Sequence, residues 1–225
     1  MLERLDTGGP SLRSASLLEA LRERTKDLHV RAERSGIVAD ILHGRATRNG
    51  YVLMLRSLLP VYQALEERLA SHAGSPLIGR IVRPELTRAA AIEADLKSLS
   101  VEAATLTVLP ATDNYVNAIV QASDGDGGGL ISHAYARYLG DLSGGQIVKR
   151  LLARSLDLPP GALSFYDFPA IDDIAKFKTE YRAAIDRAGD EIEDFEAVVE
   201  EGAMAFQLNI ELSVALQAEA ASRLA

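Results

Sequence analysis

Residues 133–146 read HAYARYLGDLSGGQ and lie inside a longer segment, residues 130–153, that has the periodicity of a single helix. A glycine in a helix interior costs about 1 kcal/mol relative to alanine, and this segment carries Gly140, Gly144 and Gly145. Gly140 and Gly144 are four residues apart, so they share one face of the helix. Bare backbone on that face favours a bend and lets a flat ligand or a second helix approach closely.

Two interpretations of this glycine face are open. Close packing of two helices is the usual meaning of an isolated Gly-xxx-Gly pattern. Here, however, the glycines flank Asp141, which needs a partner if it is buried, and Arg137 lies one turn earlier on the same face. With the hydroxyls of Tyr135 and Tyr138, this cluster could hold ordered water in a site, or it could be a structural Arg–Asp pair at a bend.

A second polar pattern lies on the first predicted helix, residues 17–35. Arg22, Lys26, His29 and Glu33 are spaced by four, three and four residues and therefore form one stripe. A histidine beside the apolar face, with cations one and two turns back, could bind a metal whose ligand carries carboxylates. Glu33 could then accept a hydrogen bond from the second ring nitrogen. The alternative is an ordinary salt-bridged helix surface, worth a few tenths of a kcal/mol per pair.

The composition excludes several classes of function. The 225 residues are 48% hydrophobic, enough for the core of one domain, and the net charge of −8 argues against a nucleic-acid-binding protein. The absence of cysteine excludes disulfides, zinc–thiolate sites, iron–sulfur clusters and a cysteine nucleophile. We find no signal peptide and no apolar run near the ~18 residues of a membrane span, so we expect a cytoplasmic protein with no membrane association.

The whole chain is predicted to be helical, because its segments have helical period and none alternates like a strand. Ser16 and Glu19 form a capping box before the first helix, which Gly36 is placed to end. Thr47 precedes a helix that extends to about residue 71, where Pro60 is expected to cause a kink or a split. Further helices are predicted at residues 84–98, 111–122, 171–188 and 191–224. We therefore expect a flexible tail at residues 1–15 and one all-α domain at residues 16–225.

Several stretches resemble the heme oxygenase family. Residues 21–33, LRERTKDLHVRAE, resemble the proximal helix of that family, and residues 133–146 resemble its distal-helix signature. Shorter matches follow in the same order at residues 62–67, 83–86, 177–182 and 205–210. The resemblance spans about residues 17–216. It implies an all-α fold that holds heme between the first helix and the glycine-bent distal helix.

The resemblance also implies roles for single residues. It implies His29 as the iron ligand, with Glu33 as the partner of its ring, and Asp141 as the acid that organises distal water. Residues implied for the distal network and the distal backbone are Tyr62, Arg137, Asn209, Gly140, Gly144 and Gly145. Residues implied around the macrocycle are the basic Arg22, Lys26, Lys178 and Arg182 and the aromatic Tyr135 and Phe206.

The implied reaction consumes heme, O2 and electrons and yields biliverdin, CO and Fe²⁺, so that heme is both cofactor and substrate. The basic residues suggest the IX-alpha isomer of biliverdin. The sequence has no flavin, nicotinamide or cluster motif. We therefore expect a ferredoxin, a flavodoxin or an NAD(P)H-dependent reductase as electron donor, docked near Lys149, Arg150, Lys178 and Arg182, and a possible biliverdin acceptor downstream.

Two alternatives differ from the enzyme in the residues that they need. A non-catalytic heme-binding protein for storage, transfer or sensing needs His29 but not Asp141 or the glycine-bent backbone. A helical domain of similar shape that binds no heme does not need the polar stripe of the first helix.

Overall fold

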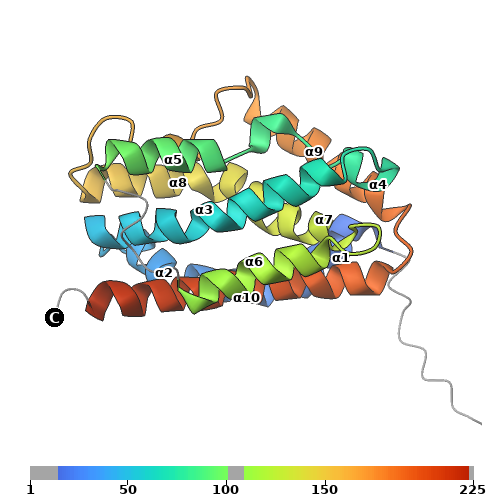
Figure 1. Ribbon diagram of the computed structural model, residues 1–225, viewed down its shortest axis with the longest axis horizontal. Coiled ribbons are helices and arrows are strands. Elements are labelled where there is room, and N and C mark those ends of the chain that lie inside the picture. The colour runs from blue at the N-terminus through green and yellow to red at the C-terminus, as the bar shows by residue number, and fades with distance from the viewer. Residues whose placement is uncertain (1–14, 101–108, 223–225) are drawn as a thin grey trace, which may run out of the picture.

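The computed structural model describes residues 15–100 and 109–222, and within these ranges every regular element is helical (Figure 1). The predicted all-α fold is therefore confirmed. The predicted N-terminal tail lies, except for residue 15, outside the described residues. The elements in chain order are α1 (Leu17–Glu33), α2 (Gly36–Leu42), α3 (Arg48–Ser71), α4 (Pro76–Gly79), η2 (Pro84–Leu86), α5 (Ala89–Ser98), α6 (Pro110–Ala122), α7 (Gly129–Ala134), η4 (Tyr135–Leu139), α8 (Gly140–Ser155), η5 (Ser164–Tyr166), α9 (Ile174–Gly189) and α10 (Phe195–Ser222).

The capping signals in the sequence mark the helix starts correctly. Ser16 Oγ accepts a hydrogen bond from the Glu19 amide at 3.3 Å, and the Glu19 carboxylate accepts one from the Ser16 amide at 3.2 Å, before α1. The Thr47 side chain caps α3 through the Gly50 amide at 3.0 Å. Pro60 lies inside α3 without splitting it. The residues before and after the proline, Leu58, Val61 and Tyr62, are buried, and such tertiary contacts supply most of the stability of a helix in a protein.

Gly36 begins a helix that the sequence analysis did not predict. Its φ of +58° lies in the left-handed region, and a Cβ atom there would lie 2.1 Å from the backbone oxygen of Ser213 on α10. Only glycine fits such a turn against another backbone. The short helix α2 thus follows α1 after a sharp change of direction at the surface of α10.

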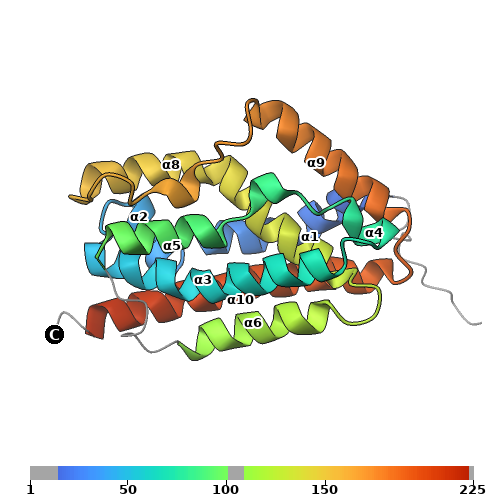
Figure 2. The ribbon, with the colours of Figure 1, turned by 45° about the horizontal axis from the view of Figure 1, so that its top comes forward.

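The predicted distal helix, residues 130–153, is continuous but not uniformly α-helical. Between α7 and α8 the segment η4 is a π-helical turn that ends directly before Gly140. An inserted π turn is a recognised cause of a helix bend. Figure 2 shows the direction changing between α7 and α8. The bend therefore coincides with the π turn as well as with the glycines from which it was predicted.

The N-terminal half of α1 is held tightly by two glycines of neighbouring helices. A Cβ at Gly202 of α10 would lie 2.5 Å from Leu21, and one at Gly189 of α9 would lie 2.6 Å from Leu17. Towards its C-terminal half the side chains of Lys26, His29 and Val30 are exposed instead. None of the described helices is both long enough and apolar enough to cross a membrane.

Candidate active site

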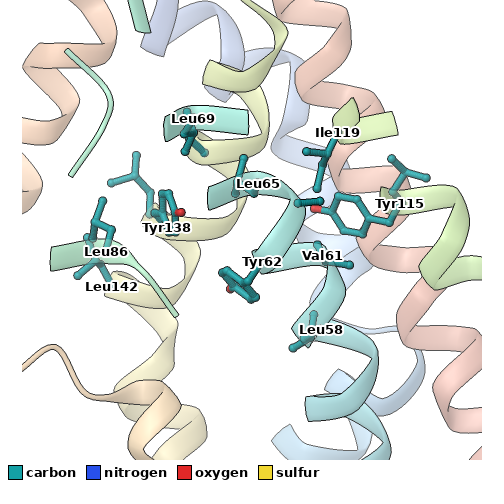
Figure 3. Packing of buried hydrophobic residues seen from close by; sticks show 14 of the residues in the cluster. Leu58, Val61, Tyr62, Leu65, Leu69, Leu86, Tyr115, Ile119, Tyr138 and Leu142 are labelled. Atoms are coloured by element: carbon teal, nitrogen blue, oxygen red, sulfur yellow. The ribbon is translucent and has the colours of Figure 1, made fainter. Parts of the chain in front are cut away.

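Tyr62 links a largely buried cation to a largely buried anion, both of which lie on the predicted distal helix. From α3 it donates a hydrogen bond to Asp141 Oδ2 at 2.5 Å. The same hydroxyl accepts hydrogen bonds from Arg137 Nε at 3.0 Å and from Arg137 Nη2 at 2.7 Å. Arg137 Nη2 and Asp141 Oδ1 are 3.7 Å apart, and the two side chains are 14% and 12% exposed. Figure 3 shows Tyr62 among the apolar side chains that surround it.

The hydrogen-bond chain continues from Arg137 to two further helices. Arg137 Nη1 donates to Asn209 Oδ1 on α10 at 2.5 Å, and Asn209 Nδ2 donates to the hydroxyl of Tyr115 on α6 at 2.9 Å. Asn209 Nδ2 also lies 2.8 Å from the backbone oxygen of Ala205. The structure therefore joins the four expected residues Tyr62, Arg137, Asp141 and Asn209 and adds Tyr115. We refer to these five side chains as the distal network.

Burial controls the protonation of this network. Burial raises the pKa of Asp141, while Arg137, the hydrogen bond from Tyr62 and the charge of Arg88 act in the opposite direction. Burial also holds the pKa of Tyr62 well above its ordinary value and raises the pKa of Tyr115 to about 12. Both phenols therefore keep their protons at neutral pH and can act as donors.

His29 lies at the meeting point of α1, α10 and η4. Its side chain is 58% exposed, and its ring centre lies 5.9 Å from that of Phe206, which in turn lies 6.2 Å from that of Tyr135. Thr25 Oγ1, one turn before His29, lies 3.5 Å from the Tyr135 hydroxyl. Glu33 Oε1 is 3.8 Å from His29 Nδ1, which is longer than a hydrogen bond.

The glycine face of α8 borders open space. A Cβ atom at Gly140 or Gly144 would meet no other atom within 4 Å, whereas one at Gly145 would lie 3.4 Å from Tyr166. Ile147, three residues after Gly144, is 49% exposed although it is a large aliphatic residue. The sequence analysis missed Ile147, although its i+3 spacing from Gly144 places it beside the glycine face.

These features fit heme as a ligand. A flat apolar macrocycle would cover Ile147 and lie against bare backbone, and the exposed imidazole of His29 would supply a nitrogen for its iron. Among the described residues no three His, Asp or Glu side chains gather to hold a metal ion.

The basic residues differ in whether they form ion pairs and in how exposed they are. No ion pair with the described part of the chain is formed by Arg22, Lys26, Lys178 or Arg182. Lys178 is partly buried, and the other three are exposed. Lys149, by contrast, forms an ion pair with Asp167 at 2.5 Å and is partly buried. Arg150 is exposed on α8. The expected docking cations are therefore available, with the exception of Lys149, whose charge is already matched.

Comparison with known proteins gives a consistent result. The family model described as heme oxygenase matches residues 15–215. Heme oxygenase 1 of Rattus norvegicus is 40% identical over 212 residues, covering 91% of this chain and 73% of its own length. Heme oxygenase 1 of Synechocystis sp. is 35% identical over 201 residues, covering 88% of this chain and 84% of its own.

Solved structures agree with the described fold. The heme oxygenase of Leptospira interrogans has a TM-score of 0.83 at 35% identity and covers 89% of this chain and 99% of its own. The heme complex of heme oxygenase-1 from Synechocystis sp. has a TM-score of 0.85 at 33% identity, with coverage of 93% and 96%.

Proposed function

The chain belongs to the heme oxygenase family, and we propose that it uses O2 and external electrons to cleave heme to biliverdin, CO and Fe²⁺. The observation that carries this proposal is the distal network, in which Asp141 lies next to the glycine face of α8. Burial of the Asp141 carboxylate is unfavourable and raises its pKa, so its retention between Tyr62 and Arg137 indicates that it has a task. A protein that only stores or transfers heme has no such task.

On the proximal side, His29 would hold the iron of heme through Nε2, because Nδ1 is directed towards Glu33. A small movement of the exposed Glu33 side chain would let it accept a hydrogen bond from Nδ1. Such a partner fixes the tautomer and the orientation of a metal-binding imidazole. Phe206 and Tyr135 would line the macrocycle next to His29.

Bound heme supplies the iron at which O2 is activated, and the distal residues determine where protons are delivered. Tyr62 donates a hydrogen bond to Asp141 Oδ2, whereas Asp141 Oδ1 lies 3.7 Å from Arg137 Nη2, beyond hydrogen-bond distance, and could accept a hydrogen bond from water. Water ordered by Asp141 would deliver protons without placing a strong acid in direct contact with the reacting atoms. The backbone of Gly140 and Gly144, where a Cβ atom would meet no other atom within 4 Å, would leave room for bound heme and its substrate O2.

The basic residues fit two further tasks. Arg22 and Lys26 on α1 and Lys178 and Arg182 on α9, which form no ion pair with the described residues, would suit the two propionates of heme. Their match to the basic residues of the family favours the IX-alpha product. The sequence contains no motif for a redox cofactor, so a ferredoxin, a flavodoxin or an NAD(P)H-dependent reductase would supply electrons. Exposed Arg150 would contribute to docking an acidic donor of this kind.

The variants Asp141→Ala and His29→Ala test the assignment. Asp141→Ala should bind heme with the absorption spectrum of a histidine ligand and lose most of its biliverdin yield in a single turnover with ascorbate. His29→Ala should lose that spectrum. A normal biliverdin yield from Asp141→Ala would contradict the role of the carboxylate, and an unchanged ferric spectrum of His29→Ala would contradict the ligand. A wild-type protein that binds heme but never converts it would instead be the non-catalytic binder.

A further inference from the structure

Helix α5 carries a buried cation and a buried anion that do not pair with each other. Arg88, the residue before its first turn, is 5% exposed, and Asp95, seven residues later on the same face, is 0% exposed. Both bind the backbone of residues 162–168, which we call the connector and which lies in the segment between α8 and α9. Leaving either charge in the interior without such partners would be very costly.

The two charges hold opposite backbone groups of the connector. Asp95 accepts hydrogen bonds from the amide of Ser164 at 2.8 Å, from its hydroxyl at 2.5 Å and from the amide of Phe165 at 2.9 Å. Arg88 donates to the backbone oxygen of Phe165 at 3.2 Å and to that of Asp167. Its guanidinium also lies 4.1 Å from the centre of the Phe168 ring. The connector is therefore fixed by charge-assisted hydrogen bonds at Ser164, Phe165 and Asp167.

The connector in turn contacts the distal side of the site at two places. The Phe165 ring meets the Tyr62 ring edge-on, with centres 5.5 Å apart and planes at 70°. Gln146 on α8 donates to the backbone oxygen of Tyr166 at 2.7 Å, next to the close approach of Gly145 to the Tyr166 ring. A displaced connector would therefore move both the ring that carries the Tyr62 hydroxyl and the helix that carries the glycine face.

We infer that Arg88 is a positioning residue of this site, which holds the connector so that Tyr62 meets Asp141 and α8 keeps its place. The expected loss of biliverdin formation rests on the proposed heme-cleaving function. The expected displacement of Tyr62 concerns the heme-free protein and does not depend on that function. Arg88 forms no hydrogen bond with Tyr62 or Asp141 among the described contacts. It acts on Tyr62 through Phe165, and on Asp141 through its positive charge.

The charge of Arg88 also acts on Asp141. The groups that face this carboxyl are the cations Arg137 and Arg88 and the phenols Tyr62, Tyr115, Tyr138 and Tyr166. The phenols are neutral at ordinary pH, so the two guanidinium groups are the charges that oppose the effect of burial. Removing the charge of Arg88 should therefore raise the pKa of Asp141 further.

Two substitutions separate the charge from the geometry. Arg88→Met removes both. Arg88→Lys keeps a positive charge but lacks the Nε and Nη2 donors to the backbone oxygens of Leu86 and Glu85, which orient Nη1 towards the connector. Arg80→Met is the matched control, since Arg80 is a half-exposed arginine that pairs with Glu191 on the surface. The heme-free proteins are compared by NMR, through the pH titration of the Asp141 carboxyl carbon and the ring resonances of Tyr62.

We expect the Asp141 midpoint to rise in Arg88→Met, to stay near that of the wild type in Arg88→Lys, and to be unchanged in Arg80→Met. The Tyr62 resonances should shift in both Arg88 variants and not in the control. With heme and ascorbate, both Arg88 variants should form biliverdin at least about tenfold more slowly, as expected for a small displacement of a catalytic group.

An unchanged Asp141 midpoint in Arg88→Met, or unchanged Tyr62 resonances in Arg88→Lys, would overturn the inference. If Arg88→Met does not fold, the Tyr62 resonances and biliverdin rate of Arg88→Lys decide the question. If the wild-type protein does not convert heme, the proposed function fails, but the two NMR measurements on heme-free protein still decide whether Arg88 positions Tyr62.

Discussion

Replacing Gly144 with alanine should strengthen the folded protein and weaken its hold on heme. The new Cβ atom would meet no other atom within 4 Å, and the glycine has no positive φ that alanine would strain. Alanine is favoured over glycine in a helix interior by up to about 1 kcal/mol, so the heme-free variant should gain about 0.5–1 kcal/mol of stability. For a chain of this length that gain raises Tm by roughly 1–4 °C.

The same methyl group would project from the glycine face into the space proposed for heme. Overpacking of a fitted site costs about 1–3 kcal/mol, which weakens heme binding roughly 5- to 150-fold. Thermal unfolding of the heme-free protein, followed by circular dichroism, measures the first effect. Titration with heme, followed by absorbance, measures the second.

Gly202→Ala is the control, because its Cβ would lie 2.5 Å from Leu21 on α1 and should lower Tm with and without heme. Two results would refute the reasoning. A lower Tm of heme-free Gly144→Ala would show that the bend itself needs this glycine. Wild-type heme affinity of the same variant would show that heme does not lie against this face.

Three further predictions concern the network and the docking of the donor. Tyr62→Phe removes the hydroxyl shared by Arg137 and Asp141 and should lower the free energy of unfolding, measured in urea, by about 2–3 kcal/mol. A loss below about 0.5 kcal/mol would contradict the bridging role of this hydroxyl. Because folding raises the pKa of Asp141, this carboxyl favours folding most below its unfolded pKa near 3.8, and that contribution is lost as pH rises through the higher folded value. The unfolding free energy of the wild type should therefore fall relative to that of Asp141→Asn as pH rises from 4 to 8. A difference between the two proteins that stays constant over this range would contradict a raised pKa of Asp141. Arg150→Glu should slow reductase-driven turnover but not turnover with ascorbate, unlike the equal charge change Lys97→Glu, and equal rates in both variants would argue against docking at Arg150.

The sequence predicted the parts of the fold that depend on neighbouring residues. Capping at Ser16 and Thr47 and the helical period located the main helices, although not the short helix α2 that begins at Gly36. The spacing of Arg137 and Asp141 placed them on one face, and the structure shows them close together. The π turn between α7 and α8, in which Tyr138 and Leu139 are buried, was not predicted, because the glycine pattern indicates a bend and not its hydrogen-bond type.

The parts of the site that depend on distant packing were harder to predict. Tyr62 and Asn209 came from the family resemblance, and Tyr115 was missed because only the packing of α6 beside α10 brings it to Asn209. Arg88 has no local signal at all. A lone arginine near a proline has the pattern of a surface residue, and its burial depends on a connector more than 70 residues later in the chain. The pairing of Lys149 with Asp167 was likewise invisible in the sequence.

The most direct test of the central claim, that this chain cleaves the heme it binds, is a single turnover. Heme is added to the purified wild-type protein, followed by ascorbate in air with catalase present, and the Soret band and the biliverdin absorption are recorded. The account predicts that the Soret band disappears while biliverdin forms, with or without catalase. A Soret band that persists, or heme loss that catalase abolishes, would contradict it.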